Sequence, residues 1–260
     1  MIFDVLTIFP DFFVSPLQEG IIRRALQDGK IEVGVHNIRD YALDRHRMTD
    51  DRPFGGGEGM VMKPEPLADC LKAVLVGDMP TRVILLSPKG QLFTQATAHR
   101  LAAYSRLVFV CGRYEGVDER FREKYVDEEV SIGDYVLTGG ELAALVVMDA
   151  VSRLLPGVLG CEDSAANDSF SCGMLKHTQY TRPRVFEGTA VPDVLLSGDH
   201  AAITRHRFIE SVKITLERRP ELLADVQFTA AERKILKKEA LLSRIDTLVK
   251  EHRTEHHSAG

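Results

Sequence analysis

The chain of 260 residues is long enough for one large domain or two modest ones. Its content of 44% hydrophobic and 27% charged residues is ordinary for a globular protein, and no apolar run is long enough to span a membrane. A net charge of −5 argues against uniform, non-specific binding to nucleic acid.

The charge is distributed unevenly along the chain. Residues 1–170 hold 18 Lys and Arg against 26 Asp and Glu, whereas residues 171–260 hold 15 against 12, with six of the nine histidines. This asymmetry suggests an acidic catalytic part and a mildly basic part that faces a polyanion. On charge alone, a solvated helical surface explains the basic part equally well.

The first part of the chain alternates strand-like and helix-like segments. Residues 1–9 are apolar and lack the basic start and the cleavage site of a signal peptide, so they predict a first buried strand. Residues 16–26 have helical spacing after Ser15, a suitable N-cap, with Pro16 at the first helical position. Residues 31–37 alternate like a half-buried strand.

The same alternation continues to the middle of the chain. Helices are expected at residues 64–76, 94–103, 118–124 and 141–155, and short buried strands at residues 82–86 and 107–111. Short apolar runs of this kind are typical of parallel strands, which are covered on both faces. The pattern predicts an α/β fold with a mostly parallel sheet.

Composition changes after the Pro-Gly pair that ends the last of these helices. We expect a first domain over residues 1–157, an interdomain linker over 158–173, a small α-helical domain over 174–250 and a flexible tail over 251–260. The linker residues are small, polar and acidic. In the second domain, helical periodicity with basic faces covers residues 200–219 and 230–252.

Four cysteines, at positions 70, 111, 161 and 172, form no CxxC pair. Cys70 and Cys111 lie in apolar runs, so buried or free thiols in a reducing cytoplasm are expected rather than disulfides. Cys161, Cys172 and His177 match no standard zinc spacing, and an ordinary loop is the favoured interpretation.

Three turns marked by glycine or proline each follow a predicted strand. They are LSPKG at 86–90, CGRYEGVDER at 111–120 and SIGDYVLTGGE at 131–141. Such turns can meet at one edge of a sheet, where their main-chain groups line a ligand pocket. An adenine there would be held by main-chain hydrogen bonds and by apolar walls such as Leu86, Pro88 and Leu137. Glycine turns also occur simply because strands must end.

A glycine-rich loop, PFGGGEGM at 53–60, matches neither the phosphate-loop pattern nor the dinucleotide fingerprint. The charged residues before it, at 44–52, suit a polar substrate, and a salt-bridged surface loop is the alternative.

Together these blocks resemble the bacterial tRNA (guanine-N1)-methyltransferases of the SPOUT class, TrmD type. The matching blocks are IFP at 8–10, DRHR at 44–47, DDRPFGGGEGM at 50–60, the three turns above, VSRLLPGVLG at 151–160, DSF at 168–170, YTRP at 180–183, PDVLLSGDH at 192–200 and RRPELL at 218–223. They follow one another from the first strand to the last helical region.

The resemblance implies a deep trefoil knot in the first domain, which ordinary topology rules would argue against. It also implies S-adenosylmethionine as cofactor, tRNA as partner of the helical domain, and an obligate homodimer. In that dimer the cofactor of one subunit lies opposite the linker and second domain of the other.

The resemblance further assigns site residues. It places the cofactor pocket at Leu86, Ser87, Pro88, Gly112, Tyr114, Glu115, Gly116, Ile132, Gly133, Asp134, Tyr135, Val136, Leu137, Gly139 and Gly140. Beside these, Asp50, Gly59, Arg207 and Arg218 are candidate substrate contacts, and His206, Lys213 and Arg219 are further candidates for contacts to phosphate. Asp50 and Glu115 are also candidates to bind a divalent ion such as Mg²⁺.

The implied product is guanosine methylated at N1, at position 37 next to the anticodon. Neutral guanine carries a proton on N1, so a carboxylate that removes it accelerates transfer by typically about 10² to 10⁴. Asp168 matches the family's base, and Arg153 matches the arginine that stabilises charge on O6. Without the resemblance, Asp168 is an N-cap or one of several loop acids, and Arg153 complements a helix dipole.

Two other functions remain open on the sequence. One is a non-catalytic RNA-binding protein with a degenerate nucleotide pocket. The other is a nucleotide-dependent α/β enzyme such as a reductase, which ranks last because the dinucleotide fingerprint is missing.

Overall fold

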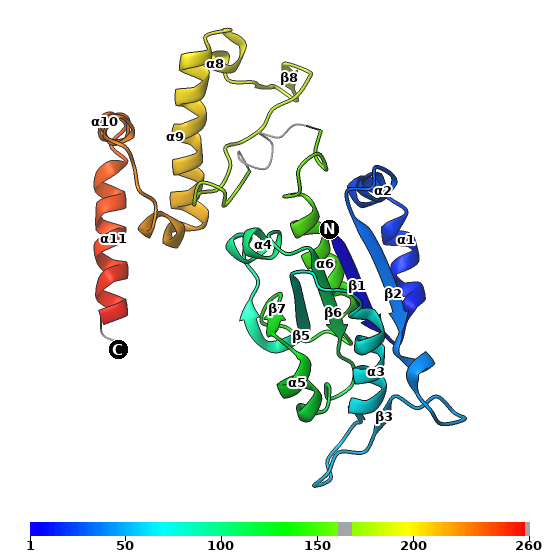
Figure 1. Cartoon of the computed structure of the whole chain (residues 1–260). Coiled ribbons are helices and arrows are strands. Elements are labelled where there is room, and N and C mark those ends of the chain that lie inside the picture. Colours follow the sequence, from blue (N-terminus) through cyan, green and yellow to red (C-terminus); the bar gives the residue numbers. More distant parts are fainter. Residues whose placement is uncertain (161–167, 258–260) are drawn as a thin grey trace. The chain divides into compact units, whose positions relative to one another are not determined.

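The computed structural model describes residues 1–160 and 168–257, with side chains to residue 250 (Figure 1). The chain divides into two compact units, Met1–Glu162 and Asp163–Gly260. Within the described residues, no helix combines the length and apolar character needed to cross a bilayer.

The first unit is built on a five-stranded sheet in the order β2-β1-β6-β5-β7. All neighbouring strands are parallel, which confirms the mostly parallel sheet that the sequence predicts. The strands are β1 (Ile2–Thr7), β2 (Glu32–Asn37), β5 (Thr81–Leu92), β6 (Arg106–Cys111) and β7 (Glu128–Ser131). Parallel strands carry their carboxyl ends to one edge, so the segments after β5, β6 and β7 start from the same edge.

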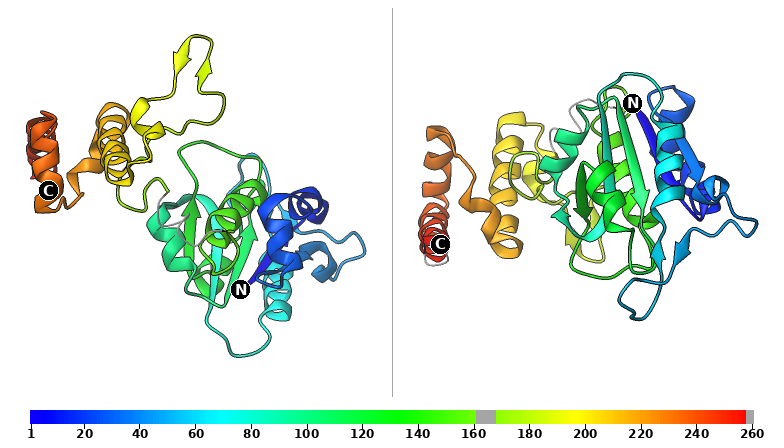
Figure 2. Two further views of the ribbon diagram at one scale, coloured as in Figure 1. Left: turned by 90° about the horizontal axis from the view of Figure 1, so that it is seen from above. Right: turned by 60° about the horizontal axis from the view of Figure 1, so that its bottom comes forward.

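Helices cover both faces of this sheet (Figures 1 and 2). One face packs against α2 (Gly20–Gln27), α4 (Gln95–Leu101) and α6 (Glu141–Ser152), and the other against α3 (Pro64–Val74) and α5 (Glu119–Tyr125). Successive residues of a strand alternate between the two cores: Phe109 belongs to the first, and Val108 and Val110 to the second. The apolar runs are therefore continuous because both faces are buried.

Shorter elements complete the first unit. They are η1 (Pro10–Phe13), α1 (Val14–Leu17), η2 (Ile38–Tyr41), β3 (Asp50–Asp51) and β4 (Val61–Met62). The β3–β4 ribbon lies at the base of a long arm that extends from the unit (Figure 2). Phe54 on this arm, which comprises residues 52–60, and Leu43 in the loop before β3 are almost fully exposed.

Two helix predictions are wrong in the same way. The single helix expected over residues 16–26 is divided between α1 and α2, because Gly20 has a left-handed φ of +61°, and Ser15 lies inside α1 instead of capping a helix. The helix expected over 230–252 is divided into α10 (Ala230–Lys238) and α11 (Leu242–His257) at Ala240, whose φ is +56°.

β5 is longer than the predicted strand and contains the LSPKG segment, which is therefore not a turn after the strand. Val130 of β7 pairs first with Leu86 and again with Gln91, so residues 87–90 bulge out between the two pairings. The Ser87 hydroxyl accepts a hydrogen bond from the amide of Lys89 at 3.1 Å and shapes this bulge. Gly90 presses against the Glu129 main chain, where a Cβ atom would clash.

The second unit has its own small core. The strands β8 (Val185–Phe186) and β9 (Thr189–Ala190) form a hairpin, followed by α8 (Asp193–Leu196), α9 (His200–Arg218), η3 (Pro220–Ala224), α10 and α11. Asp199 caps α9 by accepting hydrogen bonds from two amides at 3.0 Å. Val212, Leu223 and Leu236 are fully buried in the core. α11 continues to His257, into the stretch expected to be a tail.

Both cysteines expected in apolar runs are buried and free, which confirms that part of the prediction, whereas Cys172 is exposed. Burial raises the pKa of the Cys70 thiol to about 12, so it stays protonated at neutral pH. Cys161 lies outside the described residues.

A buried charge cluster joins three strands of the sheet. Asp4 on β1 lies 2.7 Å from His36 Nε2 on β2 and forms an ion pair with Arg106 Nε on β6 at 3.3 Å. Arg106 also donates to the carbonyls of Val74 and Val76 at 3.2 and 3.1 Å. The carboxylate therefore compensates a cation that is removed from water.

We expect Asp4→Asn to lower the free energy of unfolding by about 3–5 kcal/mol, because Arg106 then keeps a buried charge without a carboxylate. Urea unfolding followed by circular dichroism measures the effect. Asp69→Asn is the control: Asp69 pairs with Lys72 on an exposed helix face at 3.0 Å, and a change below about 1 kcal/mol is expected. Equal stabilities of the two variants would contradict this account of the cluster.

Candidate functional site

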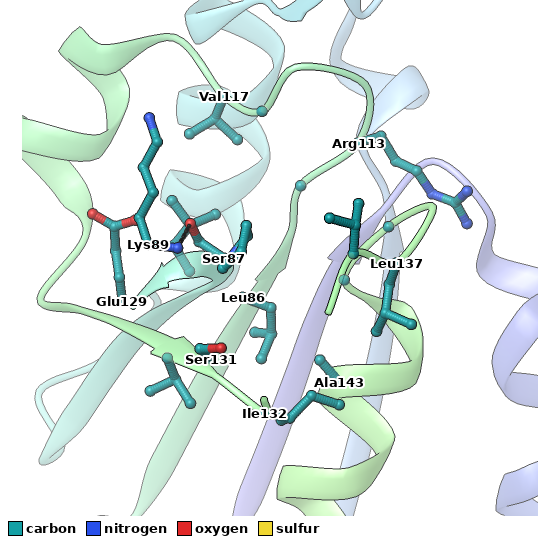
Figure 3. A pocket seen from close by; sticks show the side chains of 18 of the residues that line it. Leu86, Ser87, Lys89, Arg113, Val117, Glu129, Ser131, Ile132, Leu137 and Ala143 are labelled. Carbon is teal, nitrogen blue, oxygen red and sulfur yellow. Dashed lines mark hydrogen bonds between the residues drawn. The ribbon is translucent and has the colours of Figure 1, made fainter. Parts of the chain in front are cut away.

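A cavity of about 280 Å³ lies at the carboxyl ends of β5, β6 and β7 (Figure 3). Three main-chain segments line it: the β5 bulge, the turn after β6 and the turn between β7 and α6. Of the residues to which the resemblance assigns the cofactor, the cavity is lined by Leu86, Ser87, Pro88, Gly112, Tyr114, Glu115, Gly116, Ile132, Gly133, Tyr135, Val136, Leu137, Gly139 and Gly140. Asp134 is exposed and does not line it.

The turn after β6 is held by main-chain hydrogen bonds on both sides. Gly116 N donates to the Arg113 carbonyl at 3.0 Å, and Gly140 N donates to the Gly112 carbonyl at 3.0 Å. Glu115 N donates to the Met60 carbonyl at 3.0 Å, which ties the turn to the arm. The backbone that faces the cavity is thus fixed by bonds within and between the two turns and by one bond to Met60, which lies outside the cavity lining.

Two glycines before α6 are required by close packing. A Cβ atom on Gly140 would lie 2.8 Å from Cys111 Cα and 3.1 Å from Leu86 Cβ. A Cβ atom on Gly139 would overlap the Arg113 side chain. Neither glycine has a left-handed backbone, so the lack of space, rather than conformational freedom, selects glycine here.

The walls of the cavity divide by chemistry. Figure 3 shows Leu86, Ile132, Leu137 and Ala143 gathered on one side, while Lys89 and Glu129 project on the other. Apolar side chains with few polar groups and exposed peptide edges are typical of small-molecule sites. This arrangement fits a nucleoside, which has flat apolar faces and hydrogen-bonding edges.

Cys111 ends β6 directly before the cavity turn. Burial raises the pKa of its thiol well above the ordinary value, and the negative charge of Glu141 raises it further. The thiol therefore stays protonated and is unsuited to act as a nucleophile.

The structure places the predicted substrate residues of the first unit on the arm or at its base. Gly59 has a φ of +80° and abuts the Glu115 side chain, where a Cβ atom would lie 2.5 Å from Oε1. Asp50 is half-buried in β3 and pairs with Met62 of β4. Gly59 therefore lies against Glu115, which lines the cavity, whereas Asp50 pairs with Met62 at the base of the arm.

The two predicted catalytic residues belong to different units. Arg153 caps the carboxyl end of α6 in the first unit, and its amide donates to the Asp149 carbonyl at 3.2 Å. Asp168 is in the second unit, where its Oδ1 accepts a hydrogen bond from Lys176 Nζ at 2.9 Å. Both side chains of this pair are about one-third exposed. Val158, expected in the linker, is buried in the core of the first unit.

A second cavity, of about 420 Å³, lies within the second unit. It is lined by His177, Thr178, Gln179, Tyr180, Thr181, Arg182, Arg184, Val191, Leu195, Leu196, His206, Arg207 and Glu210. Arg207 was expected to contact substrate and lines it, whereas Arg218 does not. Arg182 and Arg184 were not singled out from the sequence, although Arg182 lies in the YTRP block.

The charge of this second cavity is predominantly positive. Among the described residues that line it, only Glu210 is acidic, and Glu210 pairs with Lys213 at 3.2 Å. Within residues 1–160 and 168–250, no carboxylate forms an ion pair with Arg182, Arg184 or Arg207. These guanidinium groups are therefore available to bind an anion such as phosphate.

The expected divalent ion receives no support. In the part of the chain that the structure describes, no group of three or more His, Cys, Asp or Glu side chains could hold a metal. Asp50 and Glu115 therefore do not form such a group. Of the combination Cys161, Cys172 and His177, Cys161 lies outside those residues.

Comparison with known proteins identifies the family. The sequence model described as tRNA (Guanine-1)-methyltransferase TrmD matches residues 1–225. A protein of Geotalea uraniireducens (strain Rf4) is 56% identical over 236 residues, which cover 91% of this chain and 96% of the relative. A protein of Chloroflexus aggregans (strain MD-66 / DSM 9485) is 57% identical over 225 residues, covering 86% and 88%.

Both relatives carry the name tRNA (guanine-N(1)-)-methyltransferase. A protein of Geobacter sulfurreducens has the same name and is 54% identical over 236 residues, which cover 91% of this chain and 96% of the relative. The resemblance seen in the sequence blocks is thereby confirmed, and this chain belongs to the tRNA (guanine-1)-methyltransferase TrmD family.

Proposed function

We propose that this protein transfers a methyl group from S-adenosylmethionine to N1 of guanosine at position 37 of tRNA, next to the anticodon. Membership of the family makes it a tRNA (guanine-N1)-methyltransferase. The observation that carries the finer proposal is the cavity at the ends of β5, β6 and β7, lined by all the assigned cofactor residues except Asp134.

The cavity fits the adenosine part of the cofactor. Leu86, Ile132 and Leu137 supply apolar walls, and the peptide groups of the glycine turns supply donors and acceptors for the base and ribose. When bound, S-adenosylmethionine supplies an electrophilic methyl group on a positively charged sulfonium. The remaining tasks of the protein are to position the guanine, to remove its N1 proton and to stabilise the charge that results.

Asp168 is proposed as the base. Its carboxylate accepts the N1 proton of guanine, so that N1 gains the lone pair that forms the new bond to carbon. Arg153 is proposed to donate hydrogen bonds to O6, where negative charge develops as the proton leaves. In this structure, the Asp168 carboxylate accepts a hydrogen bond from the Lys176 ammonium at 2.9 Å. An ion pair with both side chains about one-third exposed is weak enough for guanine to displace.

The positive cavity of the second unit supports tRNA as the substrate. Arg182, Arg184 and Arg207 present guanidinium groups that suit backbone phosphates, and the exposed Tyr180 ring offers a surface on which a base can stack. This local site reconciles tRNA binding with a net charge of −5. Phosphate contacts of this kind make affinity fall as salt rises. A tRNA substrate is in keeping with the expected cytoplasmic location.

A homodimer and a trefoil knot are part of the proposal. Leu142 and Val146, one turn apart on α6, are each about half exposed, and such apolar surface favours a partner subunit. In the dimer, the cofactor of one subunit would face Asp168 of the other. The knot is supported by family membership.

The proposal predicts methyl transfer only to tRNA with G at position 37. Purified protein is incubated with S-adenosylmethionine carrying a labelled methyl group and with tRNA transcripts that hold either G or A at that position. Label in the G transcript alone, with 1-methylguanosine in its nuclease digest, is the expected result. Binding of both transcripts without transfer would favour the non-catalytic RNA-binding alternative.

Asp168→Asn is expected to abolish turnover at neutral pH, with S-adenosylmethionine affinity nearly unchanged, because an amide cannot accept the N1 proton. Its residual rate should rise with pH, since hydroxide then removes that proton in solution. Single-turnover assays across pH measure both effects, and Asp225→Asn, at an exposed acid of the same unit, is the control. A near-normal rate for Asp168→Asn would remove Asp168 from the mechanism.

Gly140→Ala is expected to raise the Kd for S-adenosylmethionine at least tenfold, because the new methyl group forces the start of α6 away from Cys111. Calorimetry with folded protein, as judged by circular dichroism, measures the Kd. Gly160→Ala is the matched control, since no atom lies within 4 Å of a Cβ atom there. If Gly140→Ala binds S-adenosylmethionine as tightly as the wild type does, the cavity tolerates a wider gap between the two turns.

A further inference from the structure

A buried carboxylate begins α6. Glu141 is 1% exposed, and its Oε1 accepts hydrogen bonds from Thr7 Oγ1 at 2.8 Å and Arg113 Nε at 3.2 Å. Its Oε2 lies 3.0 Å from Arg113 Nη2. Removal of a carboxylate from water is costly unless a cation and hydrogen bonds compensate it, so this arrangement depends on Arg113.

Arg113 contacts the turn before α6 at a second point. Its Nη1 donates to the Thr138 carbonyl at 3.1 Å, so one guanidinium binds both the carboxylate at the start of the helix and the main chain that leads to it. The planar fork of arginine makes such two-point contacts with a fixed geometry. The Phe9 ring lies against this group, 4.4 Å from Cζ to the ring centroid.

These contacts join the two turns that face each other across the candidate cofactor cavity. Gly112 and Gly116 flank Arg113 in one turn, and Gly139 and Gly140 follow Thr138 in the other. Arg113 is itself among the residues that line the cavity, and Figure 3 shows its side chain directed away from Leu86 and Ile132. The lack of room for a side chain at Gly139 leaves space for Arg113 to pass.

We infer that Arg113, acting through Glu141 and the Thr138 carbonyl, is a positioning residue that sets the spacing of the two cavity turns. The inference rests on the proposed function, because the cavity is taken to hold S-adenosylmethionine. Arg113 needs no contact with the reacting atoms in this role. The contacts of Arg113 also connect three of the sequence blocks. Phe9 belongs to IFP, Arg113 to CGRYEG and Glu141 to TGGE.

A general contribution to stability is the competing explanation. It requires only that a positive charge neutralise Glu141. A lysine at position 113 keeps that charge but has a single nitrogen, which cannot bind Glu141 and the Thr138 carbonyl in the geometry of the fork. Arg113→Lys therefore separates charge compensation from positioning.

The first experiment compares Arg113→Lys with Asp4→Asn, which disrupts the other buried ion pair near the opposite end of β6. Amide hydrogen exchange of residues 112–116 and 138–140 is measured in the free proteins, and the Kd for S-adenosylmethionine by calorimetry. We expect Arg113→Lys to speed exchange in both turns and raise the Kd at least tenfold. Asp4→Asn should lower stability while the Kd changes less than twofold.

If Arg113→Lys does not fold, the double variant Arg113→Gln/Glu141→Gln replaces it, since removal of both charges leaves neither one buried alone. The same increase in Kd is expected. Wild-type exchange and affinity in the variant that folds, or an equal loss of affinity in Asp4→Asn, would overturn the inference. If the wild-type protein itself binds no S-adenosylmethionine, the proposed function fails. The inference about Arg113 is tested separately: if amide exchange in the two turns of the Arg113 variant equals that of the wild type, Arg113 does not couple the turns.

Discussion

The close approach of two main-chain turns is the constraint on which the candidate site depends. Gly140 donates to the Gly112 carbonyl at 3.0 Å, and there is no room for a side chain between Gly140 and Cys111. Because the turns meet through their backbones, peptide groups and not side chains form much of the cavity wall. The bulge of β5 at residues 87–90 adds a third wall of the same kind. A site built in this way favours a ligand with flat faces and hydrogen-bonding edges.

Two buried ion pairs lie near the two ends of β6 and connect it with β1. At its start, Arg106 pairs with Asp4 on β1. Beyond its end, Arg113 pairs with Glu141, which also binds Thr7 at the end of β1. Both pairs compensate charges removed from water. Of these two pairs, only Arg113–Glu141 contacts segments that line the cavity. The Asp4–Arg106 pair therefore contributes to stability, whereas the Arg113–Glu141 pair also fixes the geometry of the site.

Much of the fold follows from local patterns, and two of the errors have local causes too. Apolar runs located the buried strands because parallel strands are covered on both faces. The helix predicted over 16–26 is interrupted because Gly20 has a left-handed backbone. The helix predicted over 230–252 is interrupted at Ala240, which also has a positive φ, a conformation that alanine rarely adopts. LSPKG resembles a turn, yet it lies within β5 because Val130 pairs on both sides of the bulge. That pairing involves a strand some 40 residues further on, and no local pattern contains it.

The sequence by itself determined the α/β alternation, the glycine turns after β6 and β7, and the family, because apolar periodicity and short motifs are properties of neighbouring residues. Tertiary structure alone decided that Asp134 lies outside the cavity, that Arg182 and Arg184 share a hollow with Arg207, and that Arg113 is bound to Glu141. The physical reason is that burial, ion pairing and close packing depend on contacts between residues far apart in the chain, and these exist only once the strands and turns are assembled.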